Sequence, residues 1–398
     1  MNKTAIINGR IILPDGVIAE DKVLIYSDGK IEEIIPSGEF EAEKVSETID
    51  AGGRYVSPGF IDMHIHGGGG HDFMDGTVEA FLGVARAHAK HGTTAMIPTT
   101  VTSTDEELFR SFEVFREACR QNIEGAKMLG MHLEGPYFNP DKAGAQDLEY
   151  LKIPTPEHYE EILEKGADVI CRWSASVEIE GVEGLGKALK KHGIIASVAH
   201  TDAVYDEVVD AHNAGFTLMT HFYSAMSSVV RRNAFRHAGA VEAAYLLEDM
   251  NVEIIADGIH LPKALLQFVY KFKGPKRTAL CTDAMRGAGM PEGEYRLGSL
   301  KNGQTVIVEN GVAMLSDRSA LAGSVATADR LVRTMINLAE VPLYDAVMMM
   351  TSTPANILGI QKSKGSLAAG MDADIVFFDE NITISRTIIA GKTIYQLT

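Results

Sequence analysis

The sequence has little cysteine, and this shortage excludes two kinds of site. Three cysteines, Cys119, Cys171 and Cys281, occur in 398 residues, at wide spacing and in odd number. The pattern excludes a disulfide framework and a zinc site of the CxxC type. We therefore expect reduced thiols in a cytoplasmic protein.

Long apolar runs and a surplus of basic charge are also missing. No run approaches eighteen apolar residues, and the N-terminal stretch MNKTAIINGRIILPDG has no apolar segment of signal-peptide length before its turn signals. We expect neither a membrane span nor a signal peptide. The 37 lysines and arginines face 54 aspartates and glutamates, a net charge of −17, which disfavours nucleic acid or an anionic membrane as partner. An anionic substrate would need a local basic group.

Both ends of the chain read as short strands with turns, which predicts one small β domain built from the two termini. The runs TAIINGRII and KVLIYSDGKIEEI lie near the start, and DADIVFFD and TISRTIIAGKTIYQL lie near the end. The SDGK turn between alternating runs is a hairpin signal. Glycines in KGSLAAGMDAD mark a boundary. We predict a β domain, a β-sandwich, over residues 1–55 and 358–398 and a catalytic domain over residues 56–357.

The middle of the chain alternates strands with helical stretches such as TVEAFLGVARAHAKHG and DEELFRSFEVFREACRQ. The predicted strands are Val56–His64, Thr94–Thr100, Met128–Glu134, Val169–Ser176, Ile195–His200, Thr217–His221, Val252–Asp257 and Thr278–Asp283. Eight such units over about 250 residues are typical of a (β/α)8 barrel. The expected fold class is therefore α/β, a TIM-like barrel with a small β domain.

Polar side chains stand near the C-terminal ends of these strands, the face at which barrel enzymes build their active sites. In DMHIH, His64 and His66 are two residues apart, so both imidazoles point to the same side of a strand. The other strand ends contribute Glu134, His200, His221, Asp257, His260 and Asp283. Imidazoles and carboxylates are the natural ligands of Zn²⁺ or Fe²⁺. The pattern predicts a metal-dependent hydrolase, with His132 beside the site on the strand of Glu134.

The segment PGFIDMHIHGG resembles the first-strand signature of the amidohydrolase superfamily, and HLEGP around Glu134 resembles the N-acetylglucosamine-6-phosphate deacetylases. Many members of the superfamily carry a modified lysine where this chain has Glu134. Further similar segments are AGAQ (143–146), AHTDA (199–203), THFYSAM (220–226), ADGIH (256–260), CTDA (281–284), LAGS (321–324) and GSLAAGMDADIVFFD near the end. The resemblance spans nearly the whole chain and implies release of acetate from N-acetyl-D-glucosamine 6-phosphate.

The resemblance also implies roles for single residues. Glu134, His200 and His221 would hold the main divalent metal, and His64 and His66 would complete a second site, giving one or two Zn²⁺ or Fe²⁺ per subunit. Asp283 would act as general base and acid. The substrate contacts would come from His260, Ser224, Ala225, Ala145, Leu321 and Arg232. In the family the arginine reaches the phosphate in the neighbouring subunit of a homodimer. His132 and Asp257 would orient the groups around them.

The phosphate-binding region departs from the family pattern. Ser224 replaces an asparagine, Ser227 replaces a proline, and RNAF (232–235) replaces Arg-Glu-Pro-Gly. These changes leave open another N-acyl amino sugar, such as N-acetylgalactosamine 6-phosphate, or an N-acyl amino acid as substrate. A non-catalytic scaffold on the same fold would be expected to lose ligands or the acid on the eighth strand, and this chain keeps them all.

Overall fold

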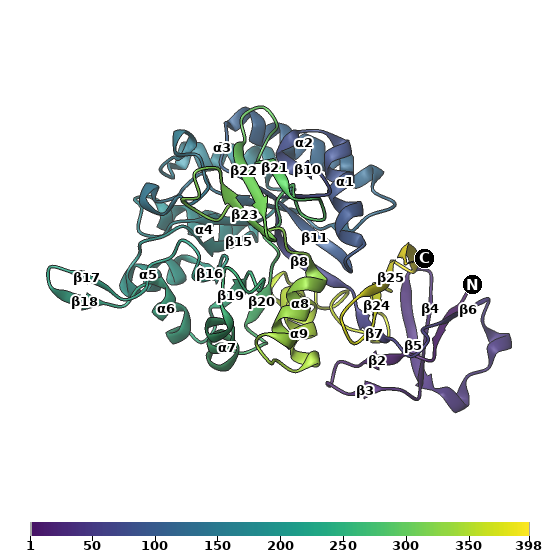
Figure 1. The fold of residues 1–398 in the computed structure, drawn as a ribbon. Helices are drawn as coiled ribbons and strands as arrows, with labels where there is room; N and C mark the ends of the chain where they lie inside the picture. The colour runs from purple at the N-terminus through teal and green to yellow at the C-terminus, as the bar shows by residue number, and fades with distance from the viewer. Residues whose placement is uncertain (1, 398) are drawn as a thin grey trace.

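The computed structural model describes residues 2–397, in which a barrel of parallel strands carries a smaller β domain at one side (Figure 1). Within these residues eight barrel strands follow one another: β8 (Phe60–Ile65), β11 (Thr93–Thr100), β13 (Met131–Glu134), β14 (Ile170–Ala175), β15 (Ile195–Val198), β16 (Phe216–Met219), β19 (Asn251–Ile254) and β20 (Thr278–Leu280). The segment after β20 returns to β8, where the backbone N–H of Asp283 donates to the oxygen of His64 at 2.8 Å. The predicted α/β barrel fold is confirmed.

Helices connect these strands and cover the barrel. They are α1 (Val78–Ala89), α2 (Asp105–Gln121), α3 (Pro156–Gly166), α4 (Val182–His192), α5 (Tyr205–Ala214), α6 (Ala240–Leu246), α7 (Lys263–Phe272), α8 (Ala328–Asn337), α9 (Leu343–Met350) and α10 (Ser352–Ile357). Local chemistry sets their ends: the Thr77 and Thr104 hydroxyls cap α1 and α2, and Gly215, with φ of 118°, ends α5. Across residues 2–397 no helix combines the length and apolar character that a membrane crossing requires.

Several barrel strands are shorter than predicted, and the difference matters for the site. β15, β16 and β20 end before His200, His221 and Asp283, so these three residues lie in loops just above the strands. The predicted strand Met128–Glu134 is broken into β12 (Lys127–Met128) and β13 at Gly130, which has φ of 152°. A side chain at Gly130 would lie 2.8 Å from the Cys171 side chain, so the break allows close packing against β14.

Strands from both termini form the small β domain, as predicted, although the exact boundaries at residues 55 and 358 stay a prediction. One sheet has the order β5 (Lys30–Pro36), β4 (Lys22–Ser27), β1 (Thr4–Ile7), β6 (Glu47–Asp50). The other has the order β26 (Lys392–Gln396), β25 (Ile384–Ile389), β24 (Ile375–Phe378), β7 (Tyr55–Pro58), β2 (Arg10–Ile12), β3 (Ile18–Ala19). Leu24, Val56 and Phe377 belong to one shared apolar core between them. The domain therefore cannot form from either terminus alone.

Three small sheets extend from the barrel and were not predicted. They are β9 (Gly67–Gly68) with β10 (His71–Asp72), the hairpin β17 (Val230–Arg232) with β18 (Phe235–His237), and the meander β21 (Gly293–Leu297), β22 (Gln304–Glu309), β23 (Val312–Leu315). The β17–β18 hairpin projects from the end of the molecule opposite the β domain (Figure 1). Short 3-10 helices lie at Ser37–Glu39, Ala42–Lys44, Phe73–Asp75, Pro140–Lys142 and Leu148–Tyr150.

A buried lysine holds the segment that joins the barrel to the β domain. The Lys364 side chain is 5% exposed, and its ammonium contacts Asp374 and, at 2.8 Å, Asp372 Oδ2. The backbone oxygen of Asp374 accepts from the N–H of Gly59, next to the first barrel strand, at 2.9 Å. Because Lys364 and Asp374 are buried together, removing the lysine leaves the carboxylate of Asp374 without its cation.

We expect Lys364→Met to lower the free energy of unfolding by about 3 kcal/mol, since it leaves the buried carboxylate of Asp374 without its cation. The midpoint of urea unfolding measures the loss. Lys30→Met is the matched control, because Lys30 is 51% exposed and pairs with the same Asp372 at 2.6 Å. That change should cost less than about 1 kcal/mol. Equal small losses in both variants would contradict the role given to Lys364.

Candidate active site

Strand ends on one face of the barrel bring together buried polar side chains. His64 lies within β8, His66 follows that strand, and Glu134 is the last residue of β13. The loops after β15, β16 and β20 add His200, His221 and Asp283. Each of these six side chains is about nine-tenths buried or more. The residues predicted as ligands and general base therefore share one site, although they span about 220 positions of sequence.

Glu134 stands between two groups of these side chains. Its Oε1 lies 3.1 Å from His221 Nε2 and 3.4 Å from His200 Nε2. Its Oε2 lies 3.3 Å from His66 Nε2, which in turn is 3.0 Å from Asp283 Oδ1. One carboxylate can therefore bridge two adjacent sets of ligand atoms.

The electrostatics of the site favour a bound cation. Burial alone would lower the pKa of His64, but the negative charges of Asp283 and Glu134 outweigh it and raise this pKa to about 9. Burial would raise the pKa of Glu134, yet the facing imidazoles, His64 foremost, hold it well below its usual range. His200 Nε2 and His221 Nε2 lie only 3.2 Å apart. Two ring lone pairs at this distance can share one cation, so the donor set fits a divalent metal.

Neighbouring groups orient these candidate ligands. The Gln146 amide donates to Glu134 Oε2 at 2.8 Å, and its own oxygen accepts from a backbone N–H. His200 Nδ1 donates to the backbone oxygen of Lys142 at 2.8 Å, which directs Nε2 toward Glu134. Such contacts fix both the ring orientation and the tautomer of a metal-binding histidine.

The loops that carry three of the site residues have uncommon backbone conformations. His200, His221 and Asp283 have φ of 48°, 28° and 46°, in the left-handed region that residues with a Cβ seldom adopt. Strain of this kind costs about 1–3 kcal/mol per residue and persists where surrounding structure enforces it. Here it accompanies the turn of each chain segment over the end of its strand.

A cavity of about 380 Å³ opens above the polar ring. The predicted substrate-contact residues Ala145, Ser224, Ala225, His260 and Leu321 all line it. His260 Nδ1 bonds to Asp257 Oδ2 at 2.9 Å, which holds the imidazole at the cavity wall. His132 lies below the cavity, where Nε2 bonds to Ser174 Oγ at 2.7 Å and the ring packs edge-on against His64. Asp257 and His132 thus contact the site from behind.

Arg232 does not join this cavity. It lies exposed on the β17–β18 hairpin, where its guanidinium donates to the backbone oxygen of Asp202 at 3.1 Å. Ser227, which replaces the family's proline, is buried, and its hydroxyl bonds to the Ala203 oxygen at 2.5 Å and the Ala240 N–H at 2.9 Å. Of the two serine substitutions, only Ser224 therefore faces the cavity.

Two further buried residues beneath the site were missed by sequence reasoning. Glu253, inside β19, accepts from His64 Nδ1 at 2.9 Å and pairs with Arg172, inside β14. The available signal was a single charge within an otherwise apolar strand, as in NVEII and VICRW. Such charges rarely stay buried without a partner, and the partner lies 81 residues away.

The comparisons with known proteins agree with this geometry. The model of the amidohydrolase family matches residues 55–394. The N-acetylglucosamine-6-phosphate deacetylase of Lysinibacillus sphaericus is 34% identical over 92% of this chain and 91% of its own length. The crystal structure of the deacetylase of that name from Pasteurella multocida has a TM-score of 0.91 at 28% identity and covers 98% of this chain and 99% of its own.

A mutant of the deacetylase from Mycobacterium smegmatis, solved in complex with N-acetyl-D-glucosamine 6-phosphate, has a TM-score of 0.90 at 27% identity over the full length of both chains. The family match covers far more than half of the residues, and the relatives match from end to end. The chain therefore belongs to the amidohydrolase family.

Proposed function

We propose that this protein is an N-acetylglucosamine-6-phosphate deacetylase, which hydrolyses the N-acetyl amide of its substrate to acetate and glucosamine 6-phosphate. The observation that carries the proposal is Glu134, which bridges two sets of imidazoles beside Asp283 at the base of an open cavity. End-to-end similarity to proteins of that name supports the substrate. A cytoplasmic location remains a prediction.

The donor set supports a divalent cofactor, Zn²⁺ or Fe²⁺. We propose that Glu134, His200 and His221 hold one ion and that His64 and His66 complete a second site. A divalent cation bound there would polarise an amide carbonyl and lower the pKa of water.

We propose that Asp283 moves the protons of the reaction. Burial would raise its pKa, but the positive charge at His64 and its contact with His66 lower it. The carboxylate is therefore ionised near neutral pH and can accept a proton from the attacking water. It can return that proton to the amide nitrogen as the C–N bond breaks. Asp257 meanwhile holds His260, whose other ring nitrogen is left to contact the carbonyl oxygen or a sugar hydroxyl.

We propose that the phosphate is bound by Arg232 from the partner chain of a homodimer. Of the lysines and arginines described in residues 2–397, only Lys142 lines the cavity, and Asp202 pairs with its ammonium at 3.1 Å. Arg232 stands on the projecting hairpin, beside Phe235, which is 74% exposed. An exposed aromatic next to an arginine is typical of a surface that another chain covers.

Asp283→Asn should lower kcat for acetate release from N-acetylglucosamine 6-phosphate by about 10³-fold, because an amide cannot take up the proton. The KM should change little. The measurement is acetate release by metal-loaded protein from this substrate. The unphosphorylated sugar and the N-acetylgalactosamine isomer are assayed for comparison. Asp141→Asn, at the mouth of the same cavity, is the matched control and should keep its rate. Acetate release by the Asp283→Asn variant at the wild-type rate would exclude this role, and no release from any wild-type assay would exclude the substrate.

Arg232→Ala should raise the KM for the phosphorylated sugar by about 10- to 100-fold, the loss of a charge-assisted contact. The KM for the unphosphorylated sugar should not move. Arg236→Ala is the control, since Arg236 lies on the same hairpin, in β18, opposite Arg231 of β17, which is the neighbour of Arg232. Mixing Arg232→Ala with Asp283→Asn chains tests the arrangement, because each mixed dimer then contains one intact site. About a quarter of the wild-type activity should return at low substrate. No recovery on mixing would place the arginine in its own subunit's site or outside both.

A further inference from the structure

A fully buried ion pair lies directly beneath the candidate metal site. Arg172 and Glu253 are both 0% exposed, and two parallel bonds of 2.6 and 2.7 Å join the guanidinium to the carboxylate. The remaining donors of Arg172 reach Ser197 Oγ at 2.9 Å, Thr220 Oγ1 at 2.8 Å and the oxygen of Met63 at 3.1 Å. All five N–H groups of the guanidinium are thereby used. The carboxylate of Glu253 is held in one orientation, and its charge is compensated.

The same carboxylate decides the tautomer of His64. Glu253 Oε1 lies 2.9 Å from His64 Nδ1. An ionised carboxylate only accepts hydrogen bonds, so Nδ1 must carry a proton. In the neutral ring the lone pair then lies on Nε2, which is 3.2 Å from His66 Nε2 and 3.5 Å from Glu134 Oε1. Nε2 of His64 therefore points toward the candidate metal site, while Nδ1, on the other side of the imidazole, points toward Glu253.

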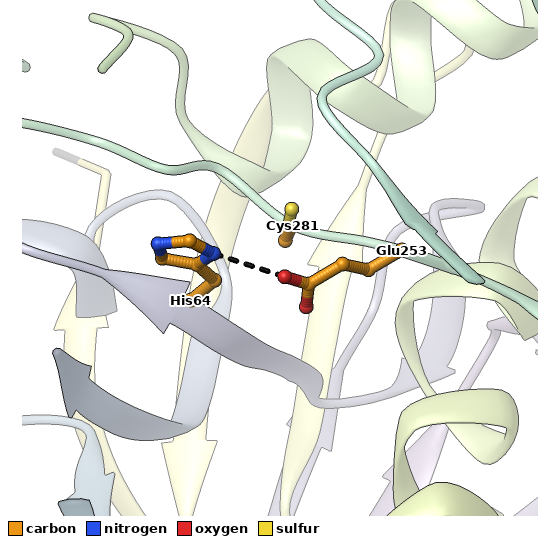
Figure 2. A group of neighbouring side chains, drawn as sticks. All are labelled: His64, Glu253 and Cys281. Atoms are coloured by element: carbon orange, nitrogen blue, oxygen red, sulfur yellow. Dashed lines mark hydrogen bonds and ion pairs between the residues drawn. The ribbon is translucent and has the colours of Figure 1, made fainter. Parts of the chain in front are cut away.

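Figure 2 shows His64, Glu253 and Cys281 as neighbouring side chains. One potential ligand atom from each lies within 4.8 Å of the others, so the cluster resembles a metal site of its own. Its chemistry argues against a metal there. The carboxylate is already neutralised by Arg172, and His64 presents a protonated nitrogen. Cys281 is fully buried, and burial together with the charge of Glu253 raises the pKa of its thiol well above the usual value. The cluster therefore orients His64.

The other imidazoles of the site lack this support. Within residues 2–397, the Nδ1 atoms of His66 and His221 have no hydrogen-bond partner, and that of His200 bonds to a loop carbonyl. Among these four histidines, His64 is the one whose Nδ1 donates to a carboxylate. Because His66 contributes to the same ion without such a partner, the geometry of this pair depends on His64.

We propose that Glu253, held by Arg172, is a positioning residue for the second metal site, which it prepares by fixing the tautomer and ring orientation of His64. This inference rests on the proposed metal-dependent function. It names Glu253 as the residue that prepares the protein to bind a second metal ion. It acts on the His64–His66 pair through the ring of His64. The Glu134–His200–His221 set meets Glu253 only through the backbone N–H of His221, which lies 3.3 Å from Oε1. The loss of such a partner typically weakens metal binding by about 10- to 100-fold.

The test is a metal titration of chelator-treated protein, which does not depend on turnover. Co²⁺ is added to wild type and to Glu253→Gln, and each affinity is read from calorimetry and from the visible absorption of bound Co²⁺. His66→Ala identifies the signal of the second ion. In Glu253→Gln we expect the second ion to bind about 10- to 100-fold more weakly and the affinity for the first ion to change much less.

Because Glu253→Gln leaves a buried arginine unpaired, a second variant guards against misfolding. Arg172→Met with Glu253→Met replaces the whole pair by apolar side chains, a change that buried pairs often tolerate. It still removes the acceptor of His64 Nδ1, so it should show the same selective loss. Ser197→Ala is the matched control, since it removes one bond of Arg172 and leaves the contact between Glu253 and His64.

Each contrary result overturns the inference in a distinguishable way. Wild-type affinity for both ions in the two Glu253 variants would overturn it and leave the proposed function standing. So would an equal loss at both ions that also occurs in Ser197→Ala, which would show a general effect on the fold. A single ion in wild type, unaffected by His66→Ala, would leave a one-metal hydrolase. No bound ion in wild type would overturn the proposed function as well.

Discussion

The buried pair of Arg172 and Glu253 is the constraint on which the catalytic end of the barrel depends. The interior of such a barrel is ordinarily filled by layers of branched apolar side chains. Here one layer contains a guanidinium that bonds to β8, β15, the end of β16 and β19. Taking two charges out of water is costly, and an apolar pair of the same volume would often be as stable. The gain is positional, because these strands also carry the imidazoles of the site.

Above this layer, the site concentrates charge that the protein alone does not balance well. The carboxylates of Glu134 and Asp283 make the buried ring strongly attractive for positive charge. Protons on the imidazoles can supply this positive charge. They would also set N–H groups against each other where two imidazole Nε2 atoms lie 3.2 Å apart. Divalent cations satisfy the same lone pairs and carboxylates together. The left-handed conformations of His200, His221 and Asp283 fit this view, since a strained backbone is most easily maintained where many contacts enforce it.

Features set by local sequence patterns could be predicted, and features set by contacts between distant segments could not. The alternation of strands and helices predicts the barrel, and residues at successive strand ends must converge once it closes, which places His64, Glu134, His200, His221 and Asp283 together. The ends of β15, β16 and β20 were placed too late, because the left-handed turn in the loop after each of them is enforced by tertiary contacts. The pairing of Glu253 with Arg172 was missed for the same reason, since it joins strands far apart in the chain. The β21–β23 meander was missed because it is an insertion between β20 and α8, and the alternation of barrel strands and helices does not specify such insertions.

Two of the three departures from the family pattern, the serines at positions 224 and 227, have different physical consequences. The Ser227 hydroxyl makes hydrogen bonds to two backbone groups at the base of the β17–β18 hairpin. It therefore stabilises the hairpin and is not free to bind a ligand. Ser224 stands on the cavity wall with a shorter side chain than the asparagine it replaces, so it reaches less far toward a phosphate or a hydroxyl. These two changes thus leave the buried ring of candidate ligands and Asp283 untouched, and Ser224 is the one that lines the cavity above it. The departures from the family pattern lie in the loop and hairpin after β16, outside the buried ring, where connecting segments on a rigid scaffold commonly vary.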